Sequence, residues 1–232
     1  MKFSAGPVQA RWTGRRDGDL GPADAGGGPE TLVRPPRPAG ELERRRRAIV
    51  DRSWSWVTQV HGAGVVVVRE PGDGGGAEGD ALVSDHPACC LAVFTADCAP
   101  IALASPEGVL GAVHAGWRGL AAGVVAGAAQ AMRHLGATRI EAALGPCIHP
   151  ECYEFSSEDL DRVADRLGPT VRGVTTAGRP AFDLPRAVRV SLRGADVELV
   201  VDEDICTACS PHHFSYRARG ERQRMALVVW PA

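Results

Sequence analysis

The chain carries the sequence ACCLAVFTADC at residues 88–98, followed by PIALAS at residues 100–105 and GVLGAVHAG at residues 108–116. Each is a short apolar run rich in Val, Leu, Ile and Ala, and turn residues separate the runs. Continuous apolar runs of this length are typical of strands that are buried on both faces of a sheet. The three runs therefore predict three consecutive buried strands at the centre of the fold.

Helices and further strands are expected after this centre. LAAGVVAGAAQAMRHLG (120–136) predicts one helix that ends at a glycine, and its small residues indicate close packing on a sheet. SSEDLDRVADRLG (156–168) has a serine N-cap followed by an acid, and LPRAVRVSLRG (184–194) has proline in its first turn. Further strands are expected within residues 138–146, 196–205 and 224–230. The mixture predicts an α+β fold with layered mixed β-sheets flanked by helices.

The N-terminal part has a different character. Residues 14–40 are rich in Gly, Pro and Arg without periodicity, so we expect a poorly ordered or extended segment. ELERRRRAIV (41–50) predicts a helix whose four adjacent arginines spread around its axis rather than line one face. We therefore expect a solvated helix surface there, and no nucleic-acid site. PGDGGGAEG (71–79) predicts a loop that lacks the Gly-Lys-Ser/Thr of a phosphate loop.

Length and composition limit the class of protein. A chain of 232 residues fits one domain spanning residues 1–232, and a hydrophobic content of 44% allows a sizeable core. A formal net charge of −2 gives no general attraction to nucleic acid or to an anionic membrane. The chain has no run near the roughly 18 apolar residues of a membrane span, and no signal-peptide core. We expect a cytoplasmic protein that binds neither nucleic acid nor membrane, as a monomer or weak homodimer.

Cysteines and histidines at the ends of apolar runs form the candidate site. In a reducing compartment, seven cysteines without a disulfide-like spacing are interpreted as buried thiols, metal ligands or nucleophiles. Cys89 and Cys90 lie inside an apolar run and are expected in the core. Cys98 instead follows an acid at the end of that run, and His61 and His114 occupy similar positions in QVHG and HAGWRG.

Two histidines and one cysteine form a competent ligand set for a transition metal. A catalytic zinc site typically has three protein ligands and one open position, and a mononuclear copper site also uses such donors. His61, Cys98 and His114 are therefore the candidate ligands of Zn²⁺, with Cu²⁺ as the alternative metal. The three residues lie far apart in the sequence, so their spacing alone does not indicate a shared site. For each residue taken alone, a hydrogen-bonded side chain in the core is the alternative interpretation, because lone histidines and cysteines often have that role.

The segments QVHG, DCAP and HAGWRG, in this order, resemble the YfiH family, also called the laccase-domain or multicopper-oxidase-like family. The resemblance continues in GPCIHPECYEF (145–155), FDLPRAV (182–188) and DICTACSPHHFSYRARGERQRMALVVW (204–230), and covers nearly everything from about residue 54 onward. The family's N-terminal arginine motif is only faintly visible as RWTGRRDG (11–18), with Arg15 or Arg16 as its nearest arginine. Near the end, only Arg224 matches the usual Thr-Gly-Arg.

The resemblance implies a layered α+β fold and a metal site formed by His61, Cys98 and His114. It also implies purine nucleoside phosphorylase activity on adenosine, inosine or methylthioadenosine, with adenosine deaminase activity beside it. The partners would then be a small-molecule nucleoside and phosphate. Other descriptions of the family are copper polyphenol oxidase and peptidoglycan editing factor.

Several residues near the predicted ligands are candidates for substrate contacts. Arg118 is the first candidate for phosphate, because it sits beside a ligand where a helix begins, and Arg217 of FSYR is the second. A structural ion pair or carbonyl clamp is the alternative for either arginine. Trp117 is a candidate for stacking on a base, with a packed turn aromatic as its alternative. Asp97 is expected to orient a ligand or to act as a base.

Two further features involve cysteine. Cys147 lies in a segment that the family has near its site and is expected to line the pocket. Cys206 and Cys209, followed by His212 and His213, suggest a second zinc site, but two adjacent histidines are not the usual finger spacing, so the sequence does not favour one.

Three alternatives to a phosphorylase remain at this stage. Cys98 could act as the nucleophile of a hydrolase for a peptidoglycan precursor, with His114 as its base and Asp97 nearby. The chain could be a copper-dependent polyphenol oxidase, although a true multicopper site needs more histidines than the seven present. It could also be a non-catalytic metal-binding protein, in which a fourth protein ligand closes the coordination sphere.

Overall fold

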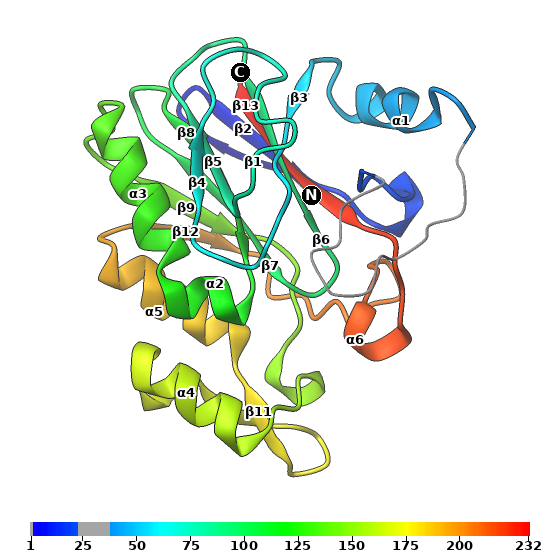
Figure 1. Cartoon of the computed structure of the whole chain (residues 1–232), viewed down its shortest axis with the longest axis vertical. Coiled ribbons are helices and arrows are strands. Elements are labelled where there is room, and N and C mark those ends of the chain that lie inside the picture. Colours follow the sequence, from blue (N-terminus) through cyan, green and yellow to red (C-terminus); the bar gives the residue numbers. More distant parts are fainter. Residues whose placement is uncertain (1, 23–37) are drawn as a thin grey trace.

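Two β-sheets packed face to face form the centre of the computed structural model, which describes residues 2–22 and 38–232 (Figure 1). The six-stranded sheet has the order β12-β9-β7-β8-β5-β4, and the five-stranded sheet has the order β1-β2-β13-β6-β3. Both contain parallel and antiparallel pairs. This arrangement confirms the predicted α+β class with layered mixed sheets.

The strands of the six-stranded sheet are β4 (Val65–Val67), β5 (Ala81–Ser84), β7 (Ala99–Ala104), β8 (Leu110–Ala115), β9 (Glu141–Leu144) and β12 (Glu198–Asp202). Those of the five-stranded sheet are β1 (Lys2–Ala5), β2 (Val8–Trp12), β3 (Trp54–Ser55), β6 (Cys90–Thr95) and β13 (Met225–Pro231). A separate hairpin pairs β10 (Arg172–Val174) with β11 (Pro180–Phe182). The three apolar runs predicted as strands thus become β6, β7 and β8, which confirms that prediction.

Successive side chains of the buried strands point to opposite faces of their sheet and belong to different hydrophobic cores. In β7, Ile101 and Leu103 face the helix-side core, whereas Ala102 and Ala104 face the core between the two sheets. In β6, Val93 faces the other sheet, and the opposite face belongs to a third core near α1 (Glu41–Ile49). Because both faces of these strands are buried, nearly every position is apolar and no polar alternation is visible in the sequence.

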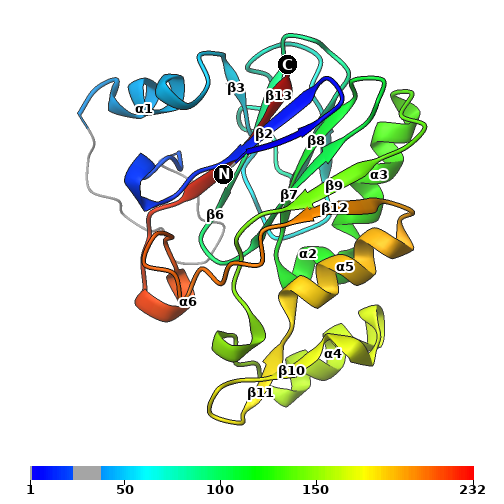
Figure 2. The same cartoon turned by 180° about the vertical axis from the view of Figure 1, so that it is seen from behind.

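Helices cover the outer face of the six-stranded sheet, as Figure 2 shows from behind. They are α2 (Trp117–Ala122), α3 (Val124–His134), α4 (Ser157–Leu167) and α5 (Leu184–Gly194), while α6 (Tyr216–Arg219) lies apart near the C-terminal strand. The Oγ of Ser156 accepts a hydrogen bond from the Asp159 N–H at 3.1 Å, which confirms the predicted N-cap of α4. None of the helices in the described part of the chain is long and apolar enough to cross a membrane.

Two helix predictions require correction. The single helix predicted for residues 120–136 is two helices, because Gly123 adopts a left-handed φ of 88° that interrupts the hydrogen-bond ladder between α2 and α3. In α1, Arg46 is 6% exposed, although its helix was predicted to have a solvated surface. Its guanidinium lies 4.6 Å from the ring centroid of Trp56 and donates to the Leu20 carbonyl, so cation–π contacts hold this arginine inside.

The N-terminal segment is described in part. Residues 15–17 form the 3₁₀ helix η1 (Arg15–Asp17), and Leu20 is fully buried in the core near α1. The prediction of an extended or poorly ordered segment for residues 14–40 otherwise falls mainly on residues 23–37, which lie outside the described residues.

Candidate metal centre

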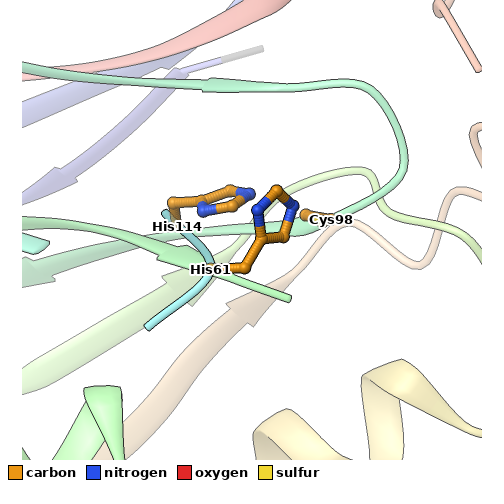
Figure 3. A group of neighbouring side chains, drawn as sticks. All are labelled: His61, Cys98 and His114. Carbon is orange, nitrogen blue, oxygen red and sulfur yellow. The ribbon is translucent and has the colours of Figure 1, made fainter. Parts of the chain in front are cut away.

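The three predicted ligands come together at one end of the six-stranded sheet (Figure 3). His114 lies near the end of β8, Cys98 immediately precedes β7, and β-pairing places Pro100 opposite His114. His61 reaches the same point from the loop before β4, with a left-handed φ of 59°. The ligand atoms of His61, Cys98 and His114 all lie within 4.8 Å of one another, and the two imidazole rings meet edge to face with centroids 4.9 Å apart.

A buried carboxylate orients this cluster. Asp80 has no exposed surface, and its Oδ1 lies 2.8 Å from Nδ1 of His114. A histidine that donates its Nδ1–H to a carboxylate leaves Nε2 free to bind a metal. Asp80 also accepts hydrogen bonds from the backbone N–H of His61 at 2.9 Å and of Gly62 at 2.6 Å. One carboxylate therefore holds both histidine-bearing segments.

Sequence reasoning missed Asp80. Its only signal is an acid immediately before the buried strand β5, a pattern that many surface turns share. Burial raises the pKa of this carboxyl, but His114 and the N–H groups of Gly62 and His61 lower it below its usual value. Asp80 thus remains charged and holds a histidine partner, as the outer carboxylates of metal sites do.

The cluster has the electrostatics of a site built for a cation. Burial by itself raises the pKa of the Cys98 thiol, but His114 and His61 lower it to about 6. Burial lowers the pKa of His114, whereas Cys98 and Asp80 raise it to about 9. Each group therefore stabilises the charged form of the other, and a metal ion would take the place of the proton between them.

Gly116 provides the room for this cluster. A Cβ at Gly116 would lie 3.1 Å from Cδ2 of His61 and 3.2 Å from Sγ of Cys98. Backbone thus approaches the two ligands more closely than a side chain would allow. The donor types, the outer carboxylate and this close approach together fit a bound transition metal.

We expect Gly116→Ala to weaken metal binding by about 10-fold, because the added methyl pushes two ligands apart. Metal affinity is measured by competition with a chelating dye. Gly194→Ala is the matched control, since a Cβ there would meet nothing within 4 Å. Equal metal affinity in the Gly116 variant and the wild type would contradict this account of the cluster.

Asp97 has a different position from the one expected. Its Oδ1 accepts a hydrogen bond from the Thr207 hydroxyl at 2.6 Å, and its Oδ2 accepts one from the Arg217 backbone N–H at 2.7 Å. Asp97 is 6% exposed and has a φ of 98°. The carboxylate therefore fastens the C-terminal loop beside Cys98. The carboxylate that contacts a predicted ligand is that of Asp80, and a role of Asp97 as a base stays a prediction.

The remaining predicted residues divide into exposed and buried groups. Arg118 is exposed at the start of α2, with its guanidinium 4.6 Å from the Trp117 ring centroid. Trp117 is partly buried and meets Phe155 edge to face at 5.7 Å. Cys147, by contrast, is 1% exposed within the helix-side core, and its predicted contact with a substrate stays a prediction.

Arg217 is exposed and combines two contacts. Its guanidinium lies 4.6 Å from the ring centroid of Tyr153, and Nη1 donates to the carbonyl of Glu154 at 2.7 Å. The contact with Glu154 is the carbonyl clamp considered as the alternative role. A face of the guanidinium remains solvent-accessible beside the Asp97 loop.

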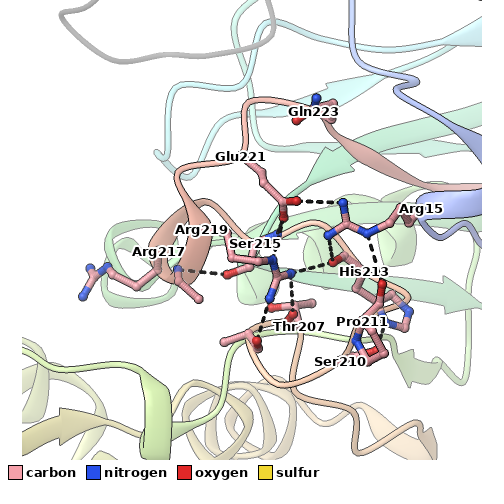
Figure 4. A network of polar contacts seen from close by, with 12 residues as sticks. Arg15, Thr207, Ser210, Pro211, His213, Ser215, Arg217, Arg219, Glu221 and Gln223 are labelled. Carbon is pink, nitrogen blue, oxygen red and sulfur yellow. Dashed lines mark hydrogen bonds and ion pairs between the residues drawn. The ribbon is translucent and has the colours of Figure 1, made fainter.

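An ion-pair network holds the loop that carries FSYR (Figure 4). Glu221 accepts hydrogen bonds from Arg15 at 2.7 Å, from Nε of Arg219 at 2.9 Å and from the Ser215 backbone N–H at 2.8 Å. Arg15 also donates to the carbonyls of Pro211 and His213. Arg15, one of the two arginines nearest to the family's N-terminal motif, therefore fastens this loop.

We expect Glu221→Gln to lower the free energy of unfolding by about 1–3 kcal/mol at neutral pH, because charge-assisted bonds are lost. Burial raises the pKa of Glu221, but Arg15, Ser215 and Arg219 lower it to about 2. A lowered folded-state pKa gives stability above the unfolded-state value, and that stability disappears as pH falls towards about 2. Urea titrations at several pH values measure the effect.

The difference between wild type and Glu221→Gln should therefore narrow below about pH 4.5. Glu158→Gln is the control, because Glu158 is exposed and pairs with Arg162 only on the surface of α4. Surface helix pairs contribute about 0.5 kcal/mol or less. A Glu221 effect that is independent of pH would exclude the carboxylate charge as its cause.

The fold and the cluster define a layered α+β protein with a His-Cys-His group able to hold one metal ion. A family model described as multi-copper polyphenol oxidoreductase laccase matches residues 40–232. The chain belongs to this family, which confirms the predicted resemblance to YfiH proteins.

Two similar proteins from other bacteria are both named purine nucleoside phosphorylase. A protein of Streptomyces coelicolor named purine nucleoside phosphorylase is 42% identical over 179 residues, which is 75% of this chain and 74% of the relative. A purine nucleoside phosphorylase of Deinococcus radiodurans is 37% identical over 201 residues, covering 84% and 78% of the two chains.

Solved structures share the fold. YlmD from Geobacillus stearothermophilus has a TM-score of 0.78 and 27% identity, covering 97% of this chain and 92% of that one. The Neisseria meningitidis protein NMB0706 has a TM-score of 0.79 and 26% identity, covering 100% and 98%. Bacillus licheniformis YfiH has a TM-score of 0.80 at 22% identity.

Proposed function

We propose that this chain is a metal-dependent purine nucleoside phosphorylase, with Zn²⁺ held by His61, Cys98 and His114. The observation that carries the proposal is the convergence of these ligand atoms within 4.8 Å beside the buried carboxylate of Asp80. The names of the relatives at 42% and 37% identity support the reaction class. Adenosine and inosine are the proposed substrates, with methylthioadenosine as a third.

The metal, when bound, supplies Lewis-acid polarisation of a substrate atom. The chain's own contribution begins with Asp80, whose carboxylate would accept the Nδ1–H of His114 and leave Nε2 available to hold the metal. Cys98 adds one negative charge, which partly neutralises the cation and selects metals that accept thiolate. Three protein donors leave one position for the nucleoside.

Phosphate binding is assigned to Arg118, two residues after Gly116. Its guanidinium is exposed and forms no ion pair within the described part of the chain, so its donors are free for an anion. Trp117 beside it offers an aromatic face to a purine. Arg217, whose guanidinium lies 6.0 Å from the ring centroid of Phe155, is the second proposed anion contact.

In the proposed reaction, a phosphate oxygen forms a bond to the anomeric carbon of the ribose while the glycosidic C–N bond breaks. The electron pair of that bond leaves with the purine, whose nitrogen takes up the proton that the attacking hydrogen phosphate releases. The products are the free base and ribose 1-phosphate. In the side reaction, water replaces the amino group at C6 of adenosine and ammonia leaves.

Arg118→Ala should raise the KM for phosphate by about 10–100-fold, because a charge-assisted contact is lost. Arg118→Lys should recover only part of that affinity, since an ammonium cannot bind phosphate bidentately. Initial rates at varied phosphate concentration measure both variants. Arg186→Ala, at an exposed position of α5, is the control and should leave this KM unchanged. An unaltered KM in both Arg118 variants would assign the phosphate to another residue.

The proposed function is tested with the full chain, adenosine or inosine, and phosphate. We expect release of free base and ribose 1-phosphate that stops in the presence of a chelator and returns with Zn²⁺. Absence of base release from the zinc-loaded protein would reject the phosphorylase. Loading with Cu²⁺ and recording the visible thiolate-to-copper band tests the alternative metal.

The thiolate–imidazolium contact of Cys98 and His114 favours a second candidate, a cysteine hydrolase. In that case Cys98 would attack a carbonyl carbon, and His114 would pass its proton to the leaving amine. A metal-bound thiolate is a poorer nucleophile, so the two functions compete for the same sulfur. Alkylation of Cys98 that is equally fast with and without Zn²⁺ would favour the hydrolase.

A further inference from the structure

Three other cysteines converge outside the His-Cys-His cluster. Cys152 ends the 3₁₀ helix η2 (Pro150–Cys152), whereas Cys206 and Cys209 lie in the turn after β12. Their sulfur atoms all lie within 4.8 Å of one another, and Cys152 Sγ is 3.4 Å from Cys209 Sγ. Two segments more than fifty residues apart in the chain therefore present three thiols to one point.

Backbone donors surround one of these sulfurs. The His149 N–H donates to Cys206 Sγ at 3.4 Å. The backbone N–H groups of Cys209 and Ala208 are also directed at this sulfur, although burial outweighs these donors and raises the pKa of the Cys206 thiol above its usual value. N–H groups directed at a cysteine sulfur stabilise a thiolate, as the outer hydrogen bonds of metal sites do. The Cys-x-x-Cys turn therefore has the local geometry of a metal-binding loop.

The composition of this cluster differs from the one that the sequence suggested. Cys206 and Cys209 are present, but the histidines that follow are not part of it: Nδ1 of His213 lies 2.8 Å from Ser210 Oγ, and His212 is exposed. The third member is Cys152, from GPCIHPECYEF. The candidate ligands in the structure are therefore three cysteines, instead of the two cysteines and two adjacent histidines that the sequence suggested.

The cluster is joined to the loop beside the first site. Thr207, between two of the cysteines, donates to the carboxylate of Asp97, which precedes Cys98. Arg219 donates to the carbonyls of Thr207 and Ala208. A tie between Cys152 and the 206–209 turn would therefore limit the movement of the loop that positions Asp97.

We propose that Cys152, Cys206 and Cys209 form a second metal site for a thiophilic cation, with Zn²⁺ as its occupant. Sulfur donors select such ions, and three cysteines leave one tetrahedral position for water or another side chain. On binding, the three S–H bonds release protons to solvent and three S–metal bonds form, without a change of oxidation state. Its role is to fasten the η2 segment to the turn after β12.

Cobalt substitution in the full chain tests this site separately from the first one. In Cys98→Ser, the first cluster has no sulfur, so any thiolate-to-cobalt charge-transfer band must arise from the other cysteines. We expect this variant, reduced and loaded with Co²⁺, to show the band and to lose it on addition of Zn²⁺. Adding Cys209→Ser, at an exposed position, should reduce the band to background.

His212→Ala in the same Cys98→Ser background is the matched control and should leave the band unchanged. In protein with Cys98 intact, Cys209→Ser should lower bound zinc from about two to about one equivalent per chain and lower Tm. Thermal unfolding of each metal-free variant shows whether it is folded. These readouts do not require nucleoside turnover, so their failure is distinguishable from failure of the proposed phosphorylase.

Three results would overturn the second site. The first is no thiolate-to-cobalt band in folded, fully reduced Cys98→Ser. The second is a band that survives Cys209→Ser but is lost in His212→Ala. The third is a Cys152–Cys209 disulfide, found by mass spectrometry in protein prepared without oxygen, which would make the 3.4 Å contact a redox pair.

Discussion

Cys98→Ser is expected to lower nucleoside phosphorolysis and metal affinity at the first site by more than about 100-fold, beyond the loss typical of an outer-shell partner. The neighbouring histidines lower the pKa of the Cys98 thiol to about 6, against the effect of burial, so a thiolate is available at neutral pH. A serine hydroxyl stays protonated under the same conditions and is a poor ligand for zinc. Metal per chain and release of base from inosine measure the two losses.

The fold should survive this substitution, because Cys98 is only partly buried and the replacement has nearly the same size. Cys89→Ala is the control: it removes a buried sulfur between the two sheets, away from the cluster, and should keep both metal and activity. Full turnover in Cys98→Ser would show that the reaction does not depend on the thiolate. Lost base release with full metal content would instead show that the sulfur of Cys98 takes part in the reaction itself and does not act only as a metal ligand.

Asp80→Asn is expected to have the second large effect, on metal binding and folding together. The amide has only one oxygen, so it cannot accept from His61, Gly62 and His114 as the carboxylate does. Its NH₂ group would also point toward a backbone N–H, so that two hydrogen-bond donors would face each other. Metal affinity should fall by about 10–100-fold. The free energy of unfolding should fall by about 3–5 kcal/mol, as for other broken buried charge pairs.

Urea titrations with and without a chelator separate the two parts of this effect. The folding part should persist in the metal-free protein, because Asp80 holds the backbone of residues 60–62 directly. Asp85→Asn, at the exposed end of the same strand segment, is the control and should change stability by less than about 0.5 kcal/mol. Unchanged stability of metal-free Asp80→Asn would mean that this carboxylate matters only when metal is bound.

Most elements whose signals lie within a few neighbouring residues were predicted correctly, and features that depend on distant residues were missed. The buried strands β6, β7 and β8 and the helix α5 were predicted, because apolar runs, proline in a first turn and capping residues act within a few positions. The break at Gly123 was missed, since glycine within a helical pattern is often tolerated. Burial of Arg46 was missed as well, because its aromatic partners Trp56 and Phe94 lie outside its own helix.

The candidate metal centre was also predicted only in part. The sequence by itself determined the types of strand and helix, and, through family motifs, that His61, Cys98 and His114 belong together. Only the tertiary structure decided that Asp80 rather than Asp97 orients a histidine, and that Cys152 joins the Cys-x-x-Cys turn. The physical reason is that side-chain partners distant in sequence meet through strand register and loop packing, for which a local pattern contains no signal.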